Sequence, residues 1–392
     1  DFKRMLDFFT SIDDFVWGPP LLVLLVGTGI YLTIRLGLLQ IIRLPKAFKL
    51  IFAEDKGEGD ISSFAALATA LAATIGTGNI VGGATAIKTG GPGALFWMWI
   101  AAFFGMATKY AEGLLAIKFR TLDDQGNVSG GPMYYITHGF SGKWQIIAKP
   151  LAYFFAFAGV LVAWLGIGTF SQVNSITSSL QNSFGWSPKI VSVILALITA
   201  AIIFGGIQSI SKVSEKVVPF MAGLYIIAAL IVIFANFNQL LPVLEMVFQS
   251  AFTGKAAVGG FAGATVMAAM RLGIARGVFS NESGLGSAPI AAAAAKTEEP
   301  VEQGLISMTG TFIDTIIICT LTGLAILVTG QWSGSLEGAP MTQAAFSSIF
   351  GTFGELALTL SLVLFAFTTI LGWSYYGERC FEFIFKSTKF LS

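Results

Sequence analysis

Charged side chains are scarce in this chain: Asp, Glu, Lys and Arg together make up 11% of its 392 residues. Soluble domains carry about 25% charged residues, so too few are present here to cover a surface in water. A soluble enzyme and a disordered chain are therefore both excluded. The 23 basic and 22 acidic residues nearly cancel. Because no net positive field is left for phosphate groups, a nucleic-acid binder is excluded as well.

Cysteine and histidine are almost missing too. The two cysteines, Cys319 and Cys380, provide neither a disulfide framework nor a zinc pattern. The single histidine, His138, lies in a predicted loop, which argues against a histidine proton relay through a membrane. One histidine is also too few for a catalytic zinc site. We therefore expect no cofactor.

Apolar sequence is what the chain has in excess: 55% of its residues are hydrophobic, its mean hydropathy is +0.77, and 45 residues are glycine. A helix needs about 20 apolar residues to cross the roughly 30 Å core of a bilayer, whereas membrane β-strands are about 10 residues long and alternate strictly. No such alternation occurs here, so we predict an all-α polytopic membrane protein with the lipid bilayer as its partner. The predicted spans are 17–36, 61–87, 93–117, 150–178, 190–207, 217–235, 258–290, 304–330 and 352–377.

Loop charges predict the orientation, because Lys and Arg accumulate on the cytoplasmic side of a membrane. With the N-terminus outside, the cytoplasmic segments hold 15 Lys and Arg residues and the outer segments hold 5. The opposite orientation would reverse this bias. We therefore predict a multi-pass protein of the cell membrane, with its N-terminus outside and the C-terminal end of the chain in the cytoplasm.

The chain shows no Pro/Ser-rich linker and no charge block that would separate domains, so we predict a single transmembrane domain over 1–392. The longest polar interval, roughly 118–149, is a predicted cytoplasmic loop with a turn at Gly130-Gly131-Pro132. An outer segment, 237–257, contains an amphipathic stretch that is expected to lie on the membrane surface.

Two of the predicted spans, 61–87 and 258–290, are longer than a bilayer requires and are rich in glycine. The sequence Gly76-Thr77-Gly78-Asn79 stands in the middle of the first, and glycines and charged residues interrupt the second at roughly 273–281. Because glycine weakens a helix by about 1 kcal/mol relative to alanine, we expect both helices to be unwound near the midplane. Close packing between helices is the other use of glycine in membranes. It is favoured for a second set of glycines, namely Gly82, Gly83 and Gly259–Gly263.

The two interrupted spans are five spans apart and cross the predicted membrane in opposite directions. This pattern is typical of an inverted-topology repeat, in which paired broken helices bind substrate and ion near the midplane. The chain then divides into an extra N-terminal span at 15–40, a first repeat at 60–236 and a second, incomplete repeat at 258–392.

Four motifs resemble those of one transporter family. They are the run from Gly90-Gly91-Pro92-Gly93 through Phe96-Trp97-Met98-Trp99 to Gly105, then Lys109-Tyr110-Ala111-Glu112, Gly130-Gly131-Pro132-Met133-Tyr134-Tyr135 and Ser280-Asn281-Glu282-Ser283-Gly284. From about residue 15 to about residue 385, the chain resembles the alanine or glycine:cation symporters, also called sodium:alanine symporters.

This resemblance implies a leucine-transporter-type fold, with one extra N-terminal span before a core of two inverted blocks of five helices. It implies a secondary transporter rather than an enzyme. Such a protein carries a small neutral amino acid, alanine or glycine, inward with sodium or a proton by alternating access. The last two core helices are not evident in the sequence, which is therefore expected to be a truncated product. No obligate protein partner is expected.

A substrate site also follows from the resemblance. Gly76-Thr77-Gly78-Asn79 matches the Gly-x-Gly-Asn of the first core helix, which implies that the Thr77 and Gly78 amides bind the substrate carboxylate while Asn79 assists. Free amides at a helix N-terminus favour an anion on physical grounds as well.

Bulky side chains would limit the size of the substrate. The candidate walls are Phe170, Gln172, Phe279 and Trp373. The aromatic residues could equally belong to the core or face lipid. Gln172 is the better candidate, because a polar amide in an apolar span needs partners.

A cation site is implied between the unwound first core helix and the eighth. Its ligands would be the carbonyls of Ala72 and Ile75 and the hydroxyls of Thr368 and Thr369, which make a neutral cage of oxygen atoms suited to sodium. The alternative for the two threonines is a hydrogen bond to the preceding turn of their own helix.

A second sodium site is the further alternative, near Thr74, Asn79 and Asp314. Asp314 is the only acidic residue deep within its predicted span. It is therefore the best candidate if the driving ion is a proton.

The remaining charged residues within the spans have structural interpretations first. Lys109 and Glu112 stand three residues apart on one helix and are expected to neutralise each other. Spacing alone does not pair Arg271, Arg276 and Glu282. These three form either a network that holds the broken helix or a gate between the inner and outer openings.

Two other classes of membrane protein compete with a transporter. A channel should show a selectivity filter or a ring of charged residues, whereas the interruptions here lie in two different helices of one chain. An intramembrane metal hydrolase would need several His or acidic ligands, and only an unassisted serine nucleophile stays open. We therefore favour sodium-coupled uptake of small neutral amino acids.

Overall fold

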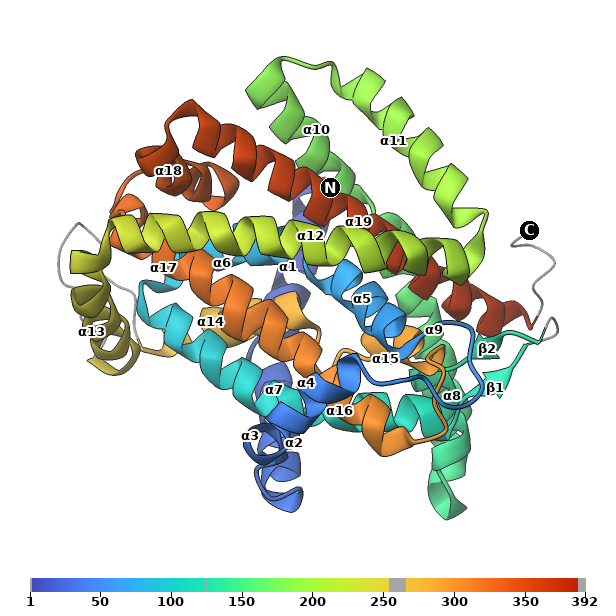
Figure 1. The fold of residues 1–392 in the computed structure, drawn as a ribbon. Helices are drawn as coiled ribbons and strands as arrows, with labels where there is room; N and C mark the ends of the chain where they lie inside the picture. Colours follow the sequence, from blue (N-terminus) through green and yellow to red (C-terminus); the bar gives the residue numbers. More distant parts are fainter. Residues whose placement is uncertain (1, 124–125, 254–265, 387–392) are drawn as a thin grey trace.

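The computed structural model describes residues 2–123, 126–253 and 266–386, which are mostly helical (Figure 1). Loops connect the helices, and β1 (Thr121–Leu122) and β2 (Val128–Ser129) form a short antiparallel hairpin. The predicted all-α class is therefore confirmed. The helices are α1 (Phe2–Val16), α2 (Pro19–Arg35), α3 (Leu39–Ile42), α4 (Leu44–Ile51), α5 (Ser63–Thr74), η1 (Gly78–Gly82), α6 (Gly83–Gly90), α7 (Gly93–Lys118), α8 (Pro132–Gly139), η2 (Gly142–Trp144), α9 (Gln145–Leu165), α10 (Phe170–Phe184), α11 (Pro188–Ile203), α12 (Gly206–Ala235), α13 (Phe237–Thr253), α14 (Val266–Asn281), α15 (Ala288–Ala293), α16 (Pro300–Thr311), η3 (Phe312–Cys319), α17 (Thr320–Val328), η4 (Gln331–Ser333), α18 (Gly338–Phe350) and α19 (Thr352–Phe385).

Most of the predicted spans correspond to apolar helices. Two shorter ones, Pro20–Arg35 and Pro188–Ile203, match the first and fifth predictions, and the bent pair of α5 with η1–α6 matches the second. The seventh predicted span begins at 258, outside the described residues, and its described part is α14 and α15. Among the described residues, the runs that are long and apolar enough to cross a membrane are Gly93–Lys118, Gly142–Phe184, Gly206–Ala235, Pro300–Val328 and Thr352–Phe385.

The second span breaks where the sequence indicated. α5 is capped by Ser62, whose hydroxyl accepts a 3.0 Å hydrogen bond from the amide of Ala65. The helix ends because Ile75 leaves the helical conformation with ψ 89°. After the break at 75–77 the chain resumes as the π-helix η1, and the two halves are bent by 50°. The predicted interruption at 76–79 is confirmed for Gly76 and Thr77, whereas Gly78 and Asn79 already belong to η1.

The break in the seventh span lies outside the predicted interval. α14 runs through 273–281 without interruption, so the predicted unwinding there is wrong. The chain leaves the helix at 282–287, where Glu282, Gly284 and Gly286 have φ angles of 56°, 85° and 80°. Glycine adopts this left-handed conformation readily, which explains the two glycines in the segment.

Two glycines inside the predicted interval serve packing instead. A Cβ on Gly273 would overlap the carbonyl oxygen of Ala94, and a Cβ on Gly277 would lie 3.3 Å from the Cβ of Ala101. Both contacts are with α7, so these glycines allow α14 to lie closely along it. The predicted packing glycines at Gly259–Gly263 lie outside the described residues.

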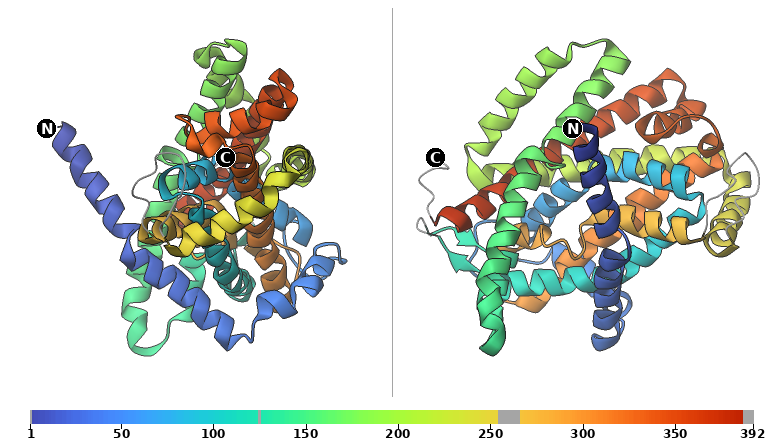
Figure 2. Two further views of the ribbon diagram at one scale, coloured as in Figure 1. Left: turned by 90° about the vertical axis from the view of Figure 1, so that its left-hand side faces the viewer. Right: turned by 180° about the vertical axis from the view of Figure 1, so that it is seen from behind.

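The broken helices lie in the middle of the bundle (Figure 1). α7 packs against α14, α15 and α16, while α12 and α19 pack against α5. α1 leads away from the bundle, as the left view of Figure 2 shows, and continues into α2, which packs along α7. The unbroken helices thus enclose the two breaks.

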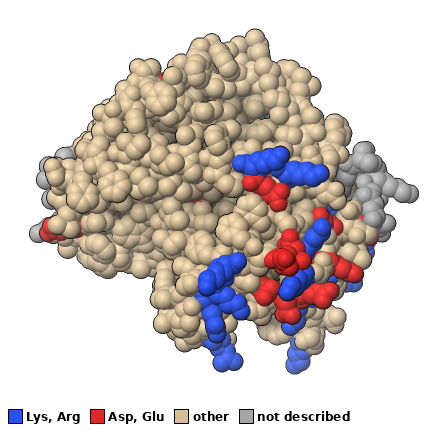
Figure 3. Space-filling model, viewed as in Figure 1, with Lys and Arg blue, Asp and Glu red and all other residues tan. Residues whose placement is uncertain are grey.

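One end of the molecule, called here the hairpin end, gathers segments that the charge pattern assigns to the cytoplasm. It comprises the loop 55–61, the hairpin region 119–131, the loop 294–297 and the C-terminal end of α19. The first loop pairs with the third, because Asp60 and Ile61 donate backbone hydrogen bonds to Ala294. Charged side chains gather on the right and in the lower middle of Figure 3, whereas the upper and left parts of the visible face are largely uncharged.

The opposite end carries α13 and α18. α13 has an inner and an outer side: Val243 and Val247 are buried, whereas Leu241 and Phe252 are exposed apolar residues. It packs against α7 and α17. Its location on a membrane surface stays a prediction, and residues 254–257 of the predicted segment lie outside the described chain.

Candidate functional site

A small cavity of about 20 Å³ lies between the two breaks and is called here the central cavity. It has room for roughly one water molecule, so the site is nearly closed in this conformation. Four parts of the chain supply its walls: the break after α5, the start of α10, the end of α14 and the middle of α19. The lining residues are Ala73, Thr74, Gly76, Thr77, Gly78, Ile167, Gln172, Phe279, Glu282, Thr369 and Trp373.

Most of the predicted substrate residues meet in this cavity. The members that the structure brings together are Gly76, Thr77, Gly78, Gln172, Phe279 and Trp373. Asn79 does not line the cavity; it is fully buried behind the break. The cavity residues come from elements far apart in the sequence, so their convergence supports one binding site.

Phe170 is not a wall of the cavity, and that prediction is wrong. Its side chain is 62% exposed on the outer face of α10. Residues two apart on a helix are separated by about 200° around the axis. Since Gln172 points into the cavity, Phe170 points away from it.

The unwound segment is held by Asn79. The Asn79 side chain accepts a 2.9 Å hydrogen bond from the Gly76 amide through Oδ1. The first amides of the following helix, at Thr77 and Gly78, have no carbonyl one turn earlier within that helix, and both residues line the cavity. A positive helix end therefore opens onto the cavity.

Position 76 has to be glycine because Thr369 on α19 lies very close to it. A Cβ at this position would lie 2.5 Å from Thr369 Oγ1. The absence of a side chain lets the Thr369 hydroxyl approach the end of α5, where it donates a 3.2 Å hydrogen bond to the carbonyl of Ala72.

The predicted cation group is brought together only in part. Thr369 reaches Ala72, and Ile75 ends α5 in a fully buried position. Thr368 instead donates a 3.0 Å hydrogen bond to Phe365 O of its own helix, and its hydroxyl faces Met221 Sδ at 3.5 Å. Thr369 shares the bond to Phe365 O, at 2.9 Å. The back-bonded alternative thus holds for both threonines, and only Thr369 also contacts α5.

Asp314 forms a second polar cluster beside the first break. It is fully buried on η3, a π-helix within the predicted eighth span; π-helical turns often mark functional sites. Its carboxylate accepts hydrogen bonds from Asn79 Nδ2 at 2.7 Å, Ser280 Oγ at 2.8 Å and Thr315 Oγ1 at 2.7 Å. Thr74, the other predicted member, turns its hydroxyl back to Ala70 O at 3.1 Å.

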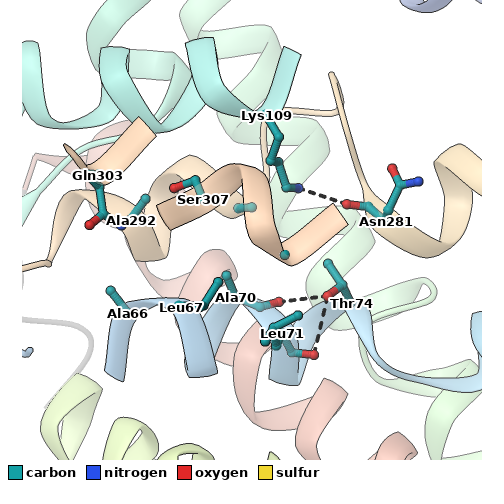
Figure 4. A pocket seen from close by; sticks show the side chains of 12 residues that line it. Ala66, Leu67, Ala70, Leu71, Thr74, Lys109, Asn281, Ala292, Gln303 and Ser307 are labelled. Carbon is teal, nitrogen blue, oxygen red and sulfur yellow. Dashed lines mark hydrogen bonds between the residues drawn. The ribbon is translucent and has the colours of Figure 1, made fainter. Parts of the chain in front are cut away.

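Lys109 stabilises the second break. Figure 4 shows it pointing from α7 across a small cavity toward Asn281. Its Nζ donates a 2.9 Å hydrogen bond to the carbonyl of Asn281, the last residue of α14. A cation at a helix C-terminus is favourable because carbonyls there lack partners.

Glu112 serves the other side of the same break. Its Oε1 accepts a 3.0 Å hydrogen bond from the amide of Gly286, just before α15. The two side chains stand three residues apart on α7, and each satisfies backbone groups that the break exposes. The predicted pairing between them is therefore wrong: within the described residues no ion pair joins Lys109 to Glu112.

Glu282 lies in the wall of the central cavity, away from the two arginines with which it was grouped. Its Oε1 accepts a 3.1 Å hydrogen bond from Trp373 Nε1, and its Oε2 accepts one from Ser287 Oγ. The carboxylate therefore fixes the indole of one wall. Sequence spacing gave no sign of this partner, which lies 91 positions away on α19.

Arg271 and Arg276 line a separate cavity of about 410 Å³, called here the vestibule. The vestibule shares Ile167 and Phe279 with the central cavity and is also lined by Trp17 of the N-terminal segment. The guanidinium of Arg276 lies 5.7 Å from the centre of the Phe279 ring. The two cavities thus meet at the Phe279 wall.

Ile167 and Ala73 are cavity residues that the sequence analysis missed. Ile167 belongs to the short break between α9 and α10, where Gly166 and Gly168 flank it. A Cβ on Gly168 would lie 2.7 Å from Trp373 Cβ. The flanking glycines were the available signal, because two glycines in one span indicate close approach or a break.

The hairpin end is closed by Arg120, which follows α7. Its guanidinium donates to four backbone carbonyls, those of Glu58, Ala293, Ala295 and Thr297, at 2.7–2.9 Å. Burial lowers the pKa of Arg120, although nearby carboxylates act in the opposite direction. The loops before α5 and after α15 are thereby tied together below the central cavity.

Asp60 links the same closure to the hairpin. Its Oδ2 accepts a 2.9 Å hydrogen bond from the Val128 amide on β2. Burial raises the pKa of Asp60, and the Val128 amide and Arg379 partly offset that effect. Arg379 on α19 pairs in turn with Asp123 of the hairpin at 3.2 Å.

Comparison with known proteins gives a consistent result. The model of the sodium:alanine symporter family matches residues 3–392. An uncharacterized transporter of Haemophilus influenzae is 56% identical over 378 residues, which cover 96% of this chain and 82% of that protein. The sodium/alanine symporter AgcS of Methanococcus maripaludis is 52% identical over 383 residues, covering 95% and 82%.

A solved structure shows a similar fold at low sequence identity. A mutant of the manganese transporter of Eremococcus coleocola superposes with a TM-score of 0.52 and 12% identity. The match covers 85% of this chain and 69% of that one.

Proposed function

The chain belongs to the sodium:alanine symporter family, whose members are transporters and not enzymes, and on that premise we propose that it carries alanine and glycine inward with sodium by alternating access. Sodium-coupled amino-acid symport by a multi-pass membrane protein follows from the family. The choice of alanine and glycine and the mechanism are the proposal. The observation that carries it is the central cavity, in which two broken helices meet.

The substrate carboxylate binds at the Thr77 and Gly78 amides in this proposal. The helix end there is positive, which suits the carboxylate of an amino acid. Phe279, Trp373 and Ile167 close the sides of the cavity. In this proposal the three bulky walls limit the side chain of the substrate to a methyl group or a hydrogen atom.

Sodium binds at the end of α5, between the carbonyls of Ala72 and Ile75 and the hydroxyl of Thr369. Support comes from the 3.2 Å contact between Thr369 and Ala72, since sodium takes oxygen ligands at the end of an unwound helix. This position lies next to the substrate cavity, which Thr369 also lines. Ion and amino acid would therefore stabilise the same closed arrangement of α5 and α19.

Asp314 is the second cation site. Lys109, Glu112, Glu282 and Asp314 are buried close to the two breaks, and they sum to a formal charge of −2 when all are ionised. A buried excess of negative charge is costly, and bound cations relieve it. Asp314 binds sodium in this proposal, and a proton is the alternative ion at the same carboxylate.

The proposed topology places the N-terminus outside and the hairpin end in the cytoplasm. The positive-inside bias of 15 against 5 basic residues supports it, as does the gathering of charge at that end (Figure 3). The two breaks, in spans that run in opposite directions, support an inverted repeat of 60–236 and 258–392 behind an extra span at 15–40.

Uptake into proteoliposomes tests the proposal. With an inward sodium gradient, labelled alanine should accumulate above equilibrium, unlabelled glycine should compete, and leucine should not. Replacement of external sodium by choline provides the control for coupling. Accumulation that is equal in sodium and choline, or equal competition by leucine and glycine, would contradict the proposal.

A further inference from the structure

The segment from the end of α2 through α4 carries four basic side chains and no acidic one. They are Arg35, Arg43, Lys46 and Lys49, all of them exposed, and we call them the basic patch. The sequence contains no Asp or Glu from residue 35 to residue 53. Within the described residues none of the four forms an ion pair. The basic patch therefore presents positive charge that has no counter-charge within ion-pair distance.

The basic patch and the packing contacts lie on different sides of α4. Arg43, Lys46 and Lys49 follow one another at three-residue intervals, which places them along one side of the helix. Ala47 and Ile51 are buried on the other side, where α4 packs against α16 and α5. The basic side chains are therefore directed away from the bundle.

The short helix α3 between the two ends of the basic patch is anchored by Gln40. This side chain is buried, and its Nε2 donates to Thr33 Oγ1 at 2.9 Å and to Phe103 O at 3.3 Å. Thr33 belongs to α2 and Phe103 to α7. The hydrogen bonds of Gln40 thus hold the segment that carries the basic patch against the membrane-spanning part of the protein.

Exposed apolar side chains lie in the same segment. Leu38, Ile41 and Ile42 are 46%, 57% and 65% exposed. They continue the apolar outer face of α2, where Tyr31 and Ile34 are exposed as well. A helical segment that combines exposed apolar residues with Lys and Arg is typical of the membrane interface, where the apolar residues meet acyl chains and the cations meet headgroups.

The sign of the charge indicates which headgroups fit. Figure 3 shows basic side chains in its lower middle, over the region of α2, α3 and α4, with no acidic side chain among them. On the right of the same view, acidic and basic side chains are mixed. Phosphate oxygens are preferred partners of Arg and Lys. The unpaired cations and the adjoining apolar residues together favour a ligand that has both a negative phosphate and acyl chains.

We propose that the basic patch binds the headgroups of anionic phospholipids while Leu38, Ile41 and Ile42 contact their acyl chains. The inference goes beyond the proposed function and does not depend on it, because this surface lies outside the central cavity and the vestibule. In the proposed topology the surface meets the cytoplasmic leaflet, which is negatively charged. Each Lys or Arg near such a surface raises the affinity for it by about fivefold.

Lipid binding to the delipidated, detergent-purified full chain tests the proposal. Phosphatidylglycerol and phosphatidylcholine with identical acyl chains are titrated separately, and native mass spectrometry counts the bound lipids. Wild type should bind phosphatidylglycerol at least about 25-fold more tightly, the effect of two or more cations. The quadruple variant Arg35→Gln/Arg43→Gln/Lys46→Gln/Lys49→Gln should lose this preference.

A second quadruple variant provides the matched control. Lys143→Gln/Lys149→Gln/Lys212→Gln/Lys216→Gln removes the same charge from exposed positions of segments that the charge pattern assigns to the same side, and it should keep the preference. Inorganic phosphate should not displace phosphatidylglycerol, because it has no acyl chains. If the quadruple patch variant is not monodisperse, Arg43→Gln/Lys46→Gln decides the proposal and should lower the preference by at least about fivefold.

Three results would overturn the lipid surface. The first is equal affinity of wild type for phosphatidylglycerol and phosphatidylcholine. The second is a preference that the patch variants keep, or that both quadruple variants lose equally. The third is displacement of phosphatidylglycerol by inorganic phosphate, which would show a site for free anions and not for lipid.

Discussion

The side-chain amide of Asn79 donates a 2.7 Å hydrogen bond to Oδ1 of Asp314. This bond joins two π-helical segments, η1 and η3, that are 235 positions apart in the sequence. Asn79 also accepts from the Gly76 amide, so one side chain connects the unwound substrate segment to a buried carboxylate. Binding of a cation at Asp314 would therefore change the position of Asn79, and with it the unwound segment that forms the substrate site.

Replacement of Asp314 by Asn tests this connection. Asn has the same shape and removes the negative charge, so the sodium concentration for half-maximal alanine uptake should rise by about tenfold or more. A sodium titration of uptake at fixed alanine measures it. Thr315→Val, which removes only one donor to the carboxylate, should shift the midpoint less. Equal sodium midpoints in Asp314→Asn and wild type would remove Asp314 from the cation site.

The two adjacent threonines of α19 form a matched pair. Valine has the shape of threonine without the hydroxyl. Thr369→Val removes the oxygen that reaches Ala72, and the sodium midpoint should rise by about tenfold. Thr368→Val removes a hydroxyl that faces Met221, and the midpoint should stay close to wild type. Equal effects of the two variants would show that both hydroxyls, or neither, bind the ion.

Side-chain size in the central cavity should be controlled by Phe279. Truncation to Ala opens the wall shared with the vestibule, and leucine should then compete with labelled alanine at least about tenfold better, the range known for added methylene groups in apolar pockets. Phe170→Ala is the control, because that ring is 62% exposed on α10. Competition by leucine that does not change in Phe279→Ala would place the size filter elsewhere.

The charged pair on α7 should be needed for the integrity of the second break. Lys109→Met leaves the buried Asn281 carbonyl without its donor and should lower the free energy of unfolding by about 1–3 kcal/mol. Glu112→Gln keeps an acceptor for the Gly286 amide and should cost less than about 1 kcal/mol. Thermal unfolding in detergent measures both. A lower Tm for Glu112→Gln than for Lys109→Met would contradict the assigned hydrogen bonds.

The first break was predictable from sequence because its signal is local. Gly76-Thr77-Gly78-Asn79 puts two glycines and two polar side chains in the middle of an apolar span, and few structures other than an unwound segment accommodate that composition. Gln172 was a candidate because a polar amide in an apolar span needs partners, but no local pattern indicates that it meets Trp373 at this segment.

The predicted position of the second break was wrong because glycine serves both close helix packing and positive φ, and the sequence does not distinguish these two uses. Gly273 and Gly277 face α7 and allow close packing, whereas Gly284 and Gly286 adopt positive φ. Whether a glycine serves packing depends on which helix lies alongside it, and no pattern within the sequence of α14 indicates that neighbour.

Phe170 and the α7 pair were misassigned for a related reason. α10 begins only at Phe170, after a break flanked by glycines, and this start decides which face of the helix meets the cavity. Lys109 and Glu112 have the spacing of a helical ion pair, but the break opposite exposes backbone groups that bind them better. In both cases the role of the side chain depends on tertiary contacts with segments that are distant in the sequence.

Closure of the hairpin end should depend on the shape of Arg120 and not only on its charge. One planar guanidinium reaches four carbonyls on two loops, whereas the lysine ammonium is a single point on a flexible stem. Arg120→Lys should therefore loosen the pairing of loops 55–61 and 294–297, and hydrogen exchange of the Asp60 and Lys296 amides should speed up by about tenfold.

Exchange of amides in the middle of α7 and α12 provides the internal reference, because those helices do not depend on the Arg120 contacts. An equal increase there would indicate global destabilisation. Since Asp60 and Lys296 flank the cytoplasmic ends of α5 and α15 in the proposed topology, a local increase confined to these loops would also favour release of substrate on this side. Unchanged exchange at both loop amides in Arg120→Lys would show that the backbone pairing alone keeps the hairpin end closed.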